Sequence, residues 1–253
     1  MWDFFKPENN VWYCWHLNGA AVYLKKDAGI WKTAFKTIPF HERNDNLEGP
    51  VAEEPPDSLP VSAATISAPD TNEQVMLHPY WSGLPYIIKL REKLSLGSEQ
   101  EIQFTAELPP MLKFELAPEA VIAEITPFTL PRTFFGPDTM DGVLGYSLPA
   151  DLEKKTKPSA MIYCDIFIKN RTKNTITLEC LALNTEALNI YFYENRLVTD
   201  ILEIGFSEET DYKTSVSQRR DEGYRLINTG LKCGLGENIA RQSIDIIKNI
   251  TQL

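Results

Sequence analysis

Apolar and polar residues alternate with a period of two along most of this chain. The clearest run is 101–108, in which every second residue is apolar. Because successive side chains of a strand point to opposite faces, this run predicts a half-buried strand. A similar run at 86–91 precedes it, and Ser95-Leu96-Gly97-Ser98 supplies a turn between the two. The sequence therefore predicts a β-hairpin here.

The segment 161–183 carries two more alternating runs, on either side of the polar stretch 170–174. A turn centred on Thr172 would place Cys164 opposite Cys180 on the buried side. A disulfide between adjacent strands is strained, so we expect two packed thiols in a second hairpin.

Further strands are predicted throughout the chain. The runs 11–17 and 20–25 flank Asn18-Gly19, a pair that favours a two-residue hairpin turn, and 30–38 follows. The chain thus opens with a meander. The later predicted strands are 112–116, 120–125, 188–193 and 197–206.

One amphipathic helix is predicted, over 237–253. Its apolar stripe consists of Ile239, Ile246, Ile247, Ile250 and Leu253. Such a stripe needs a partner surface. It either docks on the sheet of its own chain or makes a homo-oligomer or partner contact.

The predicted fold class is all-β, because strand and helix units do not alternate and no internal repeat occurs. We expect a two-sheet, mostly antiparallel β sandwich with one C-terminal amphipathic helix. Residues 1–236 form the sandwich body, either as one sandwich or as two with a break near 126, and 237–253 form the helix.

Charge argues against one class of partner. The chain has 35 acidic and 25 basic residues and a net charge of −10, without a concentrated basic stretch, which disfavours nucleic acid. The segment 42–58 carries six acids and one Arg, and we expect it to be a loop.

Sequence signals for compartment and cofactors are sparse. The start of the chain lacks a basic region followed by an apolar run, and no segment is apolar enough to span a membrane, so we expect a cytoplasmic protein. No two of the four cysteines form a Cys-x-x-Cys pair. The dispersed histidines His16, His41 and His78 predict no metal site, and we expect no cofactor.

The segment 131–146 is the most site-like part of the sequence, since it combines turn formers, an Arg, two Asp and three aromatic residues. One interpretation is two turns with aromatic residues filling the core. The other is a binding loop that includes Arg132, Asp138, Asp141 and Tyr146, in which Arg132 contacts an anionic group and the two Asp side chains contact hydroxyls or a cation. No catalytic residue is predicted.

Residues 131–206 resemble an uncharacterised prokaryotic family catalogued as a domain of unknown function, number 432. The matching features are Phe134-Phe135-Gly136, Gly142-Val143-Leu144-Gly145-Tyr146, the predicted hairpin around Asn170-Arg171-Thr172, and Leu188-Asn189-Ile190-Tyr191-Phe192-Tyr193. The resemblance implies a prokaryotic, mainly β protein and no established activity.

The function predicted from sequence is non-catalytic binding, of a protein or of a small molecule, because the recognised catalytic patterns are incomplete. Two alternatives stay open. The first is a carbohydrate-binding protein or a hydrolase with acids from several strands. The second is a homo-oligomeric structural protein.

Overall fold

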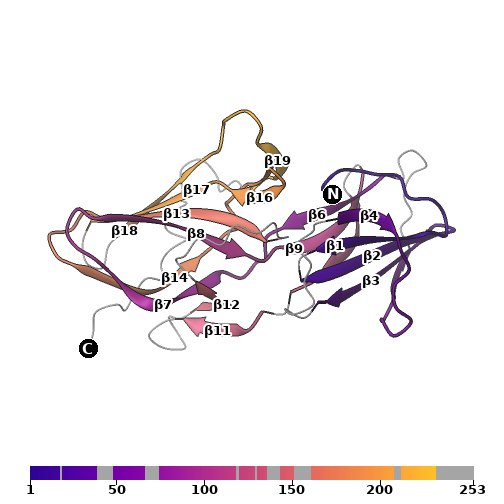
Figure 1. Cartoon of the computed structure of the whole chain (residues 1–253), viewed down its shortest axis with the longest axis horizontal. Helices are drawn as coiled ribbons and strands as arrows, with labels where there is room; N and C mark the ends of the chain where they lie inside the picture. The colour runs from indigo at the N-terminus through magenta and orange to yellow at the C-terminus, as the bar shows by residue number, and fades with distance from the viewer. Residues whose placement is uncertain are drawn as a thin grey trace. The chain divides into compact units, whose positions relative to one another are not determined.

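The computed structural model describes most of the chain. The described residues are 1–17, 19–38, 48–65, 74–117, 120–128, 130–135, 143–150, 161–207 and 212–231. They form nineteen strands and no helix, which confirms the all-β class (Figure 1). The sheets are mostly antiparallel, and the parallel pairings are β7–β12, β13–β16 and β13–β17.

Two expectations concern the C-terminal region and membranes. The predicted helix 237–253, with its proposed contact residues Ile239, Ile246, Ile247 and Ile250, lies outside the described residues. The sequence-based domain division therefore stays a prediction.

Within the described residues, no helix has the length and apolar character needed to cross a bilayer.

The described residues divide into two compact units, and the chain passes between them more than once. The first unit comprises described residues within Met1–Tyr80 and Pro109–Thr129. The second comprises those within Trp81–Leu108, Leu130–Thr156 and Met161–Leu253. The sequence left open one sandwich or two, and the described residues form four sheets, two in each unit.

The first unit contains a five-stranded sheet in the order β4-β1-β2-β3-β5 and a three-stranded sheet in the order β10-β9-β6. The strands of this unit are β1 (Trp12–Leu17), β2 (Ala20–Asp27), β3 (Ile30–Thr37), β4 (Glu48–Ala52), β5 (Ser62–Thr65), β6 (Val75–Tyr80), β9 (Met111–Leu116) and β10 (Ala120–Ile125). The predicted meander is confirmed, since β1 pairs with β2 and β2 with β3, both antiparallel.

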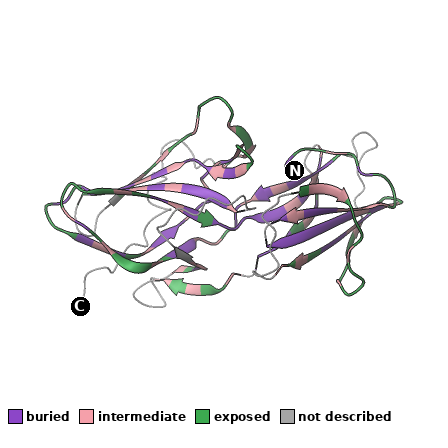
Figure 2. Ribbon diagram, in the orientation of Figure 1, coloured by how far each residue is buried: buried purple, intermediate pink, exposed green. Residues whose placement is uncertain are grey.

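Aromatic residues fill the core between these two sheets. The ring of Trp15 lies 5.1 Å from that of Phe114, and both side chains are almost wholly buried. Strand β2 is buried along nearly its whole length (Figure 2). Because β2 is buried on both faces, the sheet is also covered locally on the face opposite Trp15, which we call the outer face. There the partly buried side chains of Trp12, Ile38, Val51 and Leu59 pack against buried residues of the sheet.

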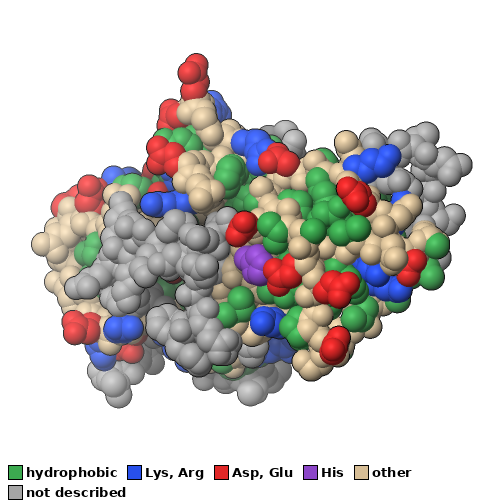
Figure 3. Space-filling model, turned by 45° about the vertical axis from the view of Figure 1, so that its right-hand side comes forward, with side chains coloured by type: hydrophobic (Ala, Val, Ile, Leu, Met, Phe, Trp, Pro, Cys, Tyr) green, Lys and Arg blue, Asp and Glu red, His purple; other side chains and the backbone are tan. Residues whose placement is uncertain are grey.

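The acidic segment 42–58 is not simply a loop, because it contains strand β4. Its charges do not prevent a strand, since Glu48 at the start of β4 is exposed while Gly49, Pro50 and Val51 are half-buried. On the molecular face in Figure 3, acidic and basic side chains are interspersed around hydrophobic ones.

The second unit contains a four-stranded sheet in the order β11-β12-β7-β14 and a seven-stranded sheet built around β13. The strands of this unit are β7 (Tyr86–Leu96), β8 (Glu101–Leu108), β11 (Arg132–Phe135), β12 (Val143–Ala150), β13 (Ile162–Asn170), β14 (Ile176–Leu183), β15 (Ile190–Tyr193), β16 (Arg196–Thr199), β17 (Ile201–Phe206), β18 (Tyr212–Ser217) and β19 (Arg225–Asn228).

The two hairpins predicted in this unit are wrong, although their strands are right. Strand β7 pairs with β14, and β8 pairs with β13, so each predicted turn carries the chain from one sheet to the other. Alternation determines which face of a strand is buried but not which strand lies beside it. Cys164 and Cys180 accordingly lie on strands of different sheets, and both are free thiols.

Asn170 links the two connections that cross between the sheets, the one from β7 to β8 and the one from β13 to β14. Its side chain is fully buried, and Nδ2 donates to the carbonyl oxygens of Leu96 at 2.9 Å, Gly97 at 3.0 Å and Asn174 at 2.8 Å. Its Oδ1 accepts from the backbone N–H of Thr172 at 2.9 Å. One buried amide thus satisfies backbone groups of both connections, from β7 to β8 and from β13 to β14.

The predicted strand 197–206 is interrupted at Asp200. This carboxylate is buried and accepts hydrogen bonds from the backbone N–H of Asn189 and the hydroxyl of Tyr191, both at 2.8 Å. The interruption separates β16, which pairs with β15, from β17, which pairs with β18. The buried Asp200 therefore lies where pairing with β15 ends and pairing with β18 begins.

Candidate functional site

The residues predicted from the 131–146 segment are only partly brought together. Arg132 on β11 and Tyr146 on β12 are direct cross-strand partners and so share a face. Arg132 is exposed, while Tyr146 is half-buried with its ring 5.9 Å from that of Tyr86. Asp138 and Asp141 lie outside the described residues. The binding loop therefore stays a prediction.

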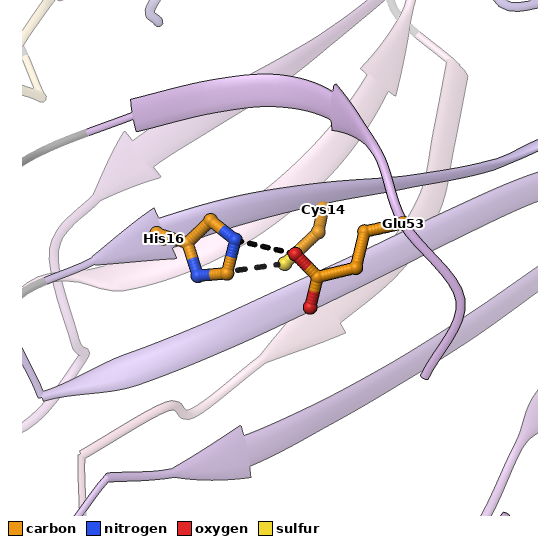
Figure 4. A group of neighbouring side chains, drawn as sticks. All are labelled: Cys14, His16 and Glu53. Atoms are coloured by element: carbon orange, nitrogen blue, oxygen red, sulfur yellow. Dashed lines mark hydrogen bonds and ion pairs between the residues drawn. The ribbon is translucent and has the colours of Figure 1, made fainter. Parts of the chain in front are cut away.

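A different cluster of reactive side chains lies in the first unit. Cys14 and His16 project from β1, and Glu53 follows directly after β4 (Figure 4). One potential ligand atom from each of the three side chains lies within 4.8 Å of the others. We call Cys14, His16 and Glu53 the β1–β4 cluster.

Strand periodicity places the first two residues of the cluster. Trp15 points into the core, so Cys14 and His16 on either side of it point to the outer face. There Cys14 packs with Ala21, Tyr23 and Ala34 in a small buried cluster of the kind that forms under long connections.

Strand β4 places Glu53 beside Cys14 and His16. It pairs antiparallel with β1, and the register shifts between Cys14 and His16. Gly49 makes the close approach possible, because it has a φ of +140° and a Cβ there would lie 2.8 Å from the Cα of Trp15. The backbone N–H of Glu53 then donates to the carbonyl of Trp12 at 3.1 Å, which fixes the start of its side chain.

The side chains form a continuous chain of polar contacts. His16 Nε2 lies 2.7 Å from Glu53 Oε2, and His16 Nδ1 lies 4.0 Å from Cys14 Sγ. The hydroxyl of Tyr23 donates to Glu53 Oε1 at 3.3 Å. Because the carboxylate can only accept, an Nε2–H donates to it, and in a neutral imidazole Nδ1 can then accept from the thiol.

Burial is uneven across the cluster. Cys14 and Tyr23 are almost wholly buried, whereas the side chains of His16 and Glu53 are 34% and 41% exposed. Burial, with the nearby Glu53 charge, raises the pKa of the Cys14 thiol to about 12. Burial and the neighbouring Cys14 also raise the pKa of Tyr23. Without an added positive charge, the thiol therefore stays protonated and is a poor nucleophile.

Thiol, imidazole and carboxylate together are a common ligand set for transition metals. Tetrahedral zinc with bonds of about 2.0 to 2.3 Å separates its ligand atoms by roughly 3.3 to 3.8 Å. An imidazole binds one ion through one nitrogen, and Nε2, which lies 2.7 Å from Glu53 Oε2, is the nitrogen nearer the carboxylate. One ligand atom from each of the three side chains lies within 4.8 Å of the others, which is wider than this range, so the side chains have to rotate inward to bind one ion. Because the His16 and Glu53 side chains are partly exposed, they have room to do so, and the donor set fits a metal ion.

Comparison with known proteins identifies the family. Residues 1–232 match a protein-family model described as "Protein of unknown function (DUF432)". The chain belongs to this family. No curated protein and no solved structure matches it.

The DUF432 match confirms the resemblance seen over 131–206 and extends it to the first unit, including the β1–β4 cluster. The family description names no activity, so it assigns no role to any residue. The chemistry of the cluster therefore has to be argued from its own geometry.

This DUF432 chain has a second histidine contact in the first unit. His78 Nδ1 lies 3.6 Å from Glu115 Oε2, and Lys113 Nζ lies 2.7 Å from the same oxygen. The His78 and Glu115 side chains are only 12% and 13% exposed. Burial lowers the pKa of His78 more than Glu115 raises it, so the imidazole is held neutral.

Sequence reasoning missed the β1–β4 cluster, because it tested cysteines and histidines separately as metal ligands and did not combine them with a carboxylate. Cys14-Trp15-His16 on a predicted strand was the available signal, since residues two apart share a face. Glu53 left no such signal. Its position depends on the pairing of β4 with β1, which joins segments far apart in the sequence.

Proposed function

We propose that this protein binds a divalent transition-metal ion, with zinc as the best match, through Cys14, His16 and Glu53. The proposal retains the sequence-based expectation of a binding protein and assigns no reaction. The observation that carries it is the convergence of three different ligand types within 4.8 Å at a partly exposed position.

The ligand types favour zinc over magnesium or calcium. Magnesium and calcium take oxygen ligands almost exclusively, whereas thiolate and imidazole suit zinc and its neighbours in the first transition series. A thiolate ligand also requires reduced Cys14, which agrees with its free thiol and with the proposed cytoplasmic location.

An entering ion would take the places of protons. The hydrogen between His16 Nε2 and Glu53 Oε2 would move to His16 Nδ1, so that the imidazole stays neutral, and the Cys14 thiol would release to solvent the proton that burial otherwise retains. A doubly charged ion offsets the cost of a buried thiolate, because an opposite charge close by favours the ionised form. Tyr23, donating to Glu53 Oε1, would hold the carboxylate toward the ion.

A zinc titration against a chromophoric chelator tests this proposal. We expect one zinc per chain in the wild type and an affinity weaker by about 100-fold in Cys14→Ala, because one of three ligands is lost. Cys180→Ala is the matched control, since this partly buried thiol lies in the second unit, and it should bind as the wild type does. Equal affinities in all three proteins would refute the proposal.

A further inference from the structure

We infer that the ion bound by the β1–β4 cluster keeps one coordination position for a small monovalent anion, and that the ammonium group of Lys36 helps to hold this anion. The inference rests on the proposed metal binding and adds a second ligand to the same site.

An open position follows from the number of ligands. Three protein ligands leave one place on a tetrahedral zinc ion, which water or another small ligand occupies. The uneven burial of the cluster indicates toward which side this open coordination position faces. Cys14 and Tyr23 form the buried side of the cluster, and the exposed parts of His16 and Glu53 form the side that solvent reaches.

Lys36 lies on the same face of the sheet. His16 pairs with Ala21 across β1 and β2, and Ala21 pairs with Lys36 across β2 and β3. Directly paired residues of antiparallel strands share a face, so the half-buried lysine and the imidazole flank the small Ala21. The positive charge of Lys36 also acts on Cys14, where it opposes the rise in thiol pKa.

Formal charge supports a monovalent anion. A divalent ion with one thiolate and one carboxylate is neutral, and Lys36 leaves the group with a single positive charge. Glu48 is the direct partner of His16 on β4, and Lys25 and Lys32 lie further along the same face. Glu48 is exposed, so water and salt screen its charge more than those of the buried ligands. One bound monovalent anion would make the site neutral.

The test uses the full chain loaded with Co²⁺, with azide as the anion and visible absorption as the readout. A sulfur-to-cobalt charge-transfer band reports the Cys14 bond, and the ligand-field bands report the fourth position. We expect azide to shift the ligand-field bands while the sulfur band persists. Lys36→Met should weaken the apparent affinity for azide by about three- to tenfold, as expected for one charge-assisted contact.

Lys32→Met is the matched control, because Lys32 lies on the same face of β3 but pairs with Asp27 at 2.7 Å. It should leave azide binding within twofold of the wild type. Absence of the sulfur band would overturn the metal site itself. A sulfur band with azide-insensitive ligand-field bands would overturn only the anion site, and an unchanged azide affinity in Lys36→Met would overturn the role of Lys36.

Discussion

Replacing Asn170 by Ala is expected to lower the free energy of unfolding of the second unit by about 3 to 5 kcal/mol. The side chain is fully buried, and its amide serves three carbonyl oxygens and one backbone N–H. Each buried group left without a partner costs about 1 to 3 kcal/mol. Denaturant unfolding followed by hydrogen exchange in β7, β8, β13 and β14 measures the loss where it is expected.

Two further variants separate hydrogen bonding from volume. Asn170→Asp has nearly the same size, but an acceptor oxygen replaces the donating amide group and faces the three carbonyl oxygens. At neutral pH this oxygen also carries charge. The variant should therefore be at least as unstable as Asn170→Ala. Lys173→Ala changes an exposed residue of the same connection and should stay within about 0.5 kcal/mol of the wild type. A stable Asn170→Asp protein would contradict this role for the amide.

Zinc is expected to stabilise the first unit strongly. Because the three ligands meet only when β1 and β4 are paired, zinc should bind the folded unit far better than the unfolded chain. At free zinc about 100 times the dissociation constant, the gain is about 2.7 kcal/mol. For a unit of this size the melting temperature should rise by about 10 °C or more. Calorimetry with and without zinc measures the rise.

Controls for this stabilisation use both the ion and the protein. Magnesium at the same concentration should not raise the melting temperature, since it avoids thiolate and imidazole ligands. Cys14→Ala should lose the effect of zinc, whereas Cys180→Ala should keep it. A similar rise in the Cys14→Ala protein would place the stabilising ion elsewhere.

Many strands of this fold could be predicted from sequence, as could the β1–β2–β3 meander, but the neighbours of β7, β8, β13 and β14 in the second unit could not. Period-two alternation located β8, β13 and β14 because it reflects which side of a strand is buried. The crossings after β7 and β13 look like hairpin turns locally. Their true nature depends on Asn170, whose contacts with Leu96 and Gly97 span more than seventy residues of sequence.

The candidate site was predictable only in part, for the same reason. Cys14 and His16 are two residues apart on a predicted strand, so their common face follows from local geometry. Glu53 belongs to an acidic segment expected as a loop, and only the pairing of β4 with β1 brings it to them. The 131–146 segment drew attention through its composition, yet its turn formers and aromatic residues serve structure as readily as binding.

The most direct test of the central claim is zinc X-ray absorption spectroscopy on the wild-type protein loaded with one equivalent of zinc. The metal site described here predicts one sulfur neighbour at about 2.3 Å and nitrogen or oxygen neighbours at about 2.0 to 2.1 Å. The sulfur neighbour should disappear in Cys14→Ala. A zinc environment of nitrogen and oxygen alone in the wild type would contradict metal binding by Cys14, His16 and Glu53.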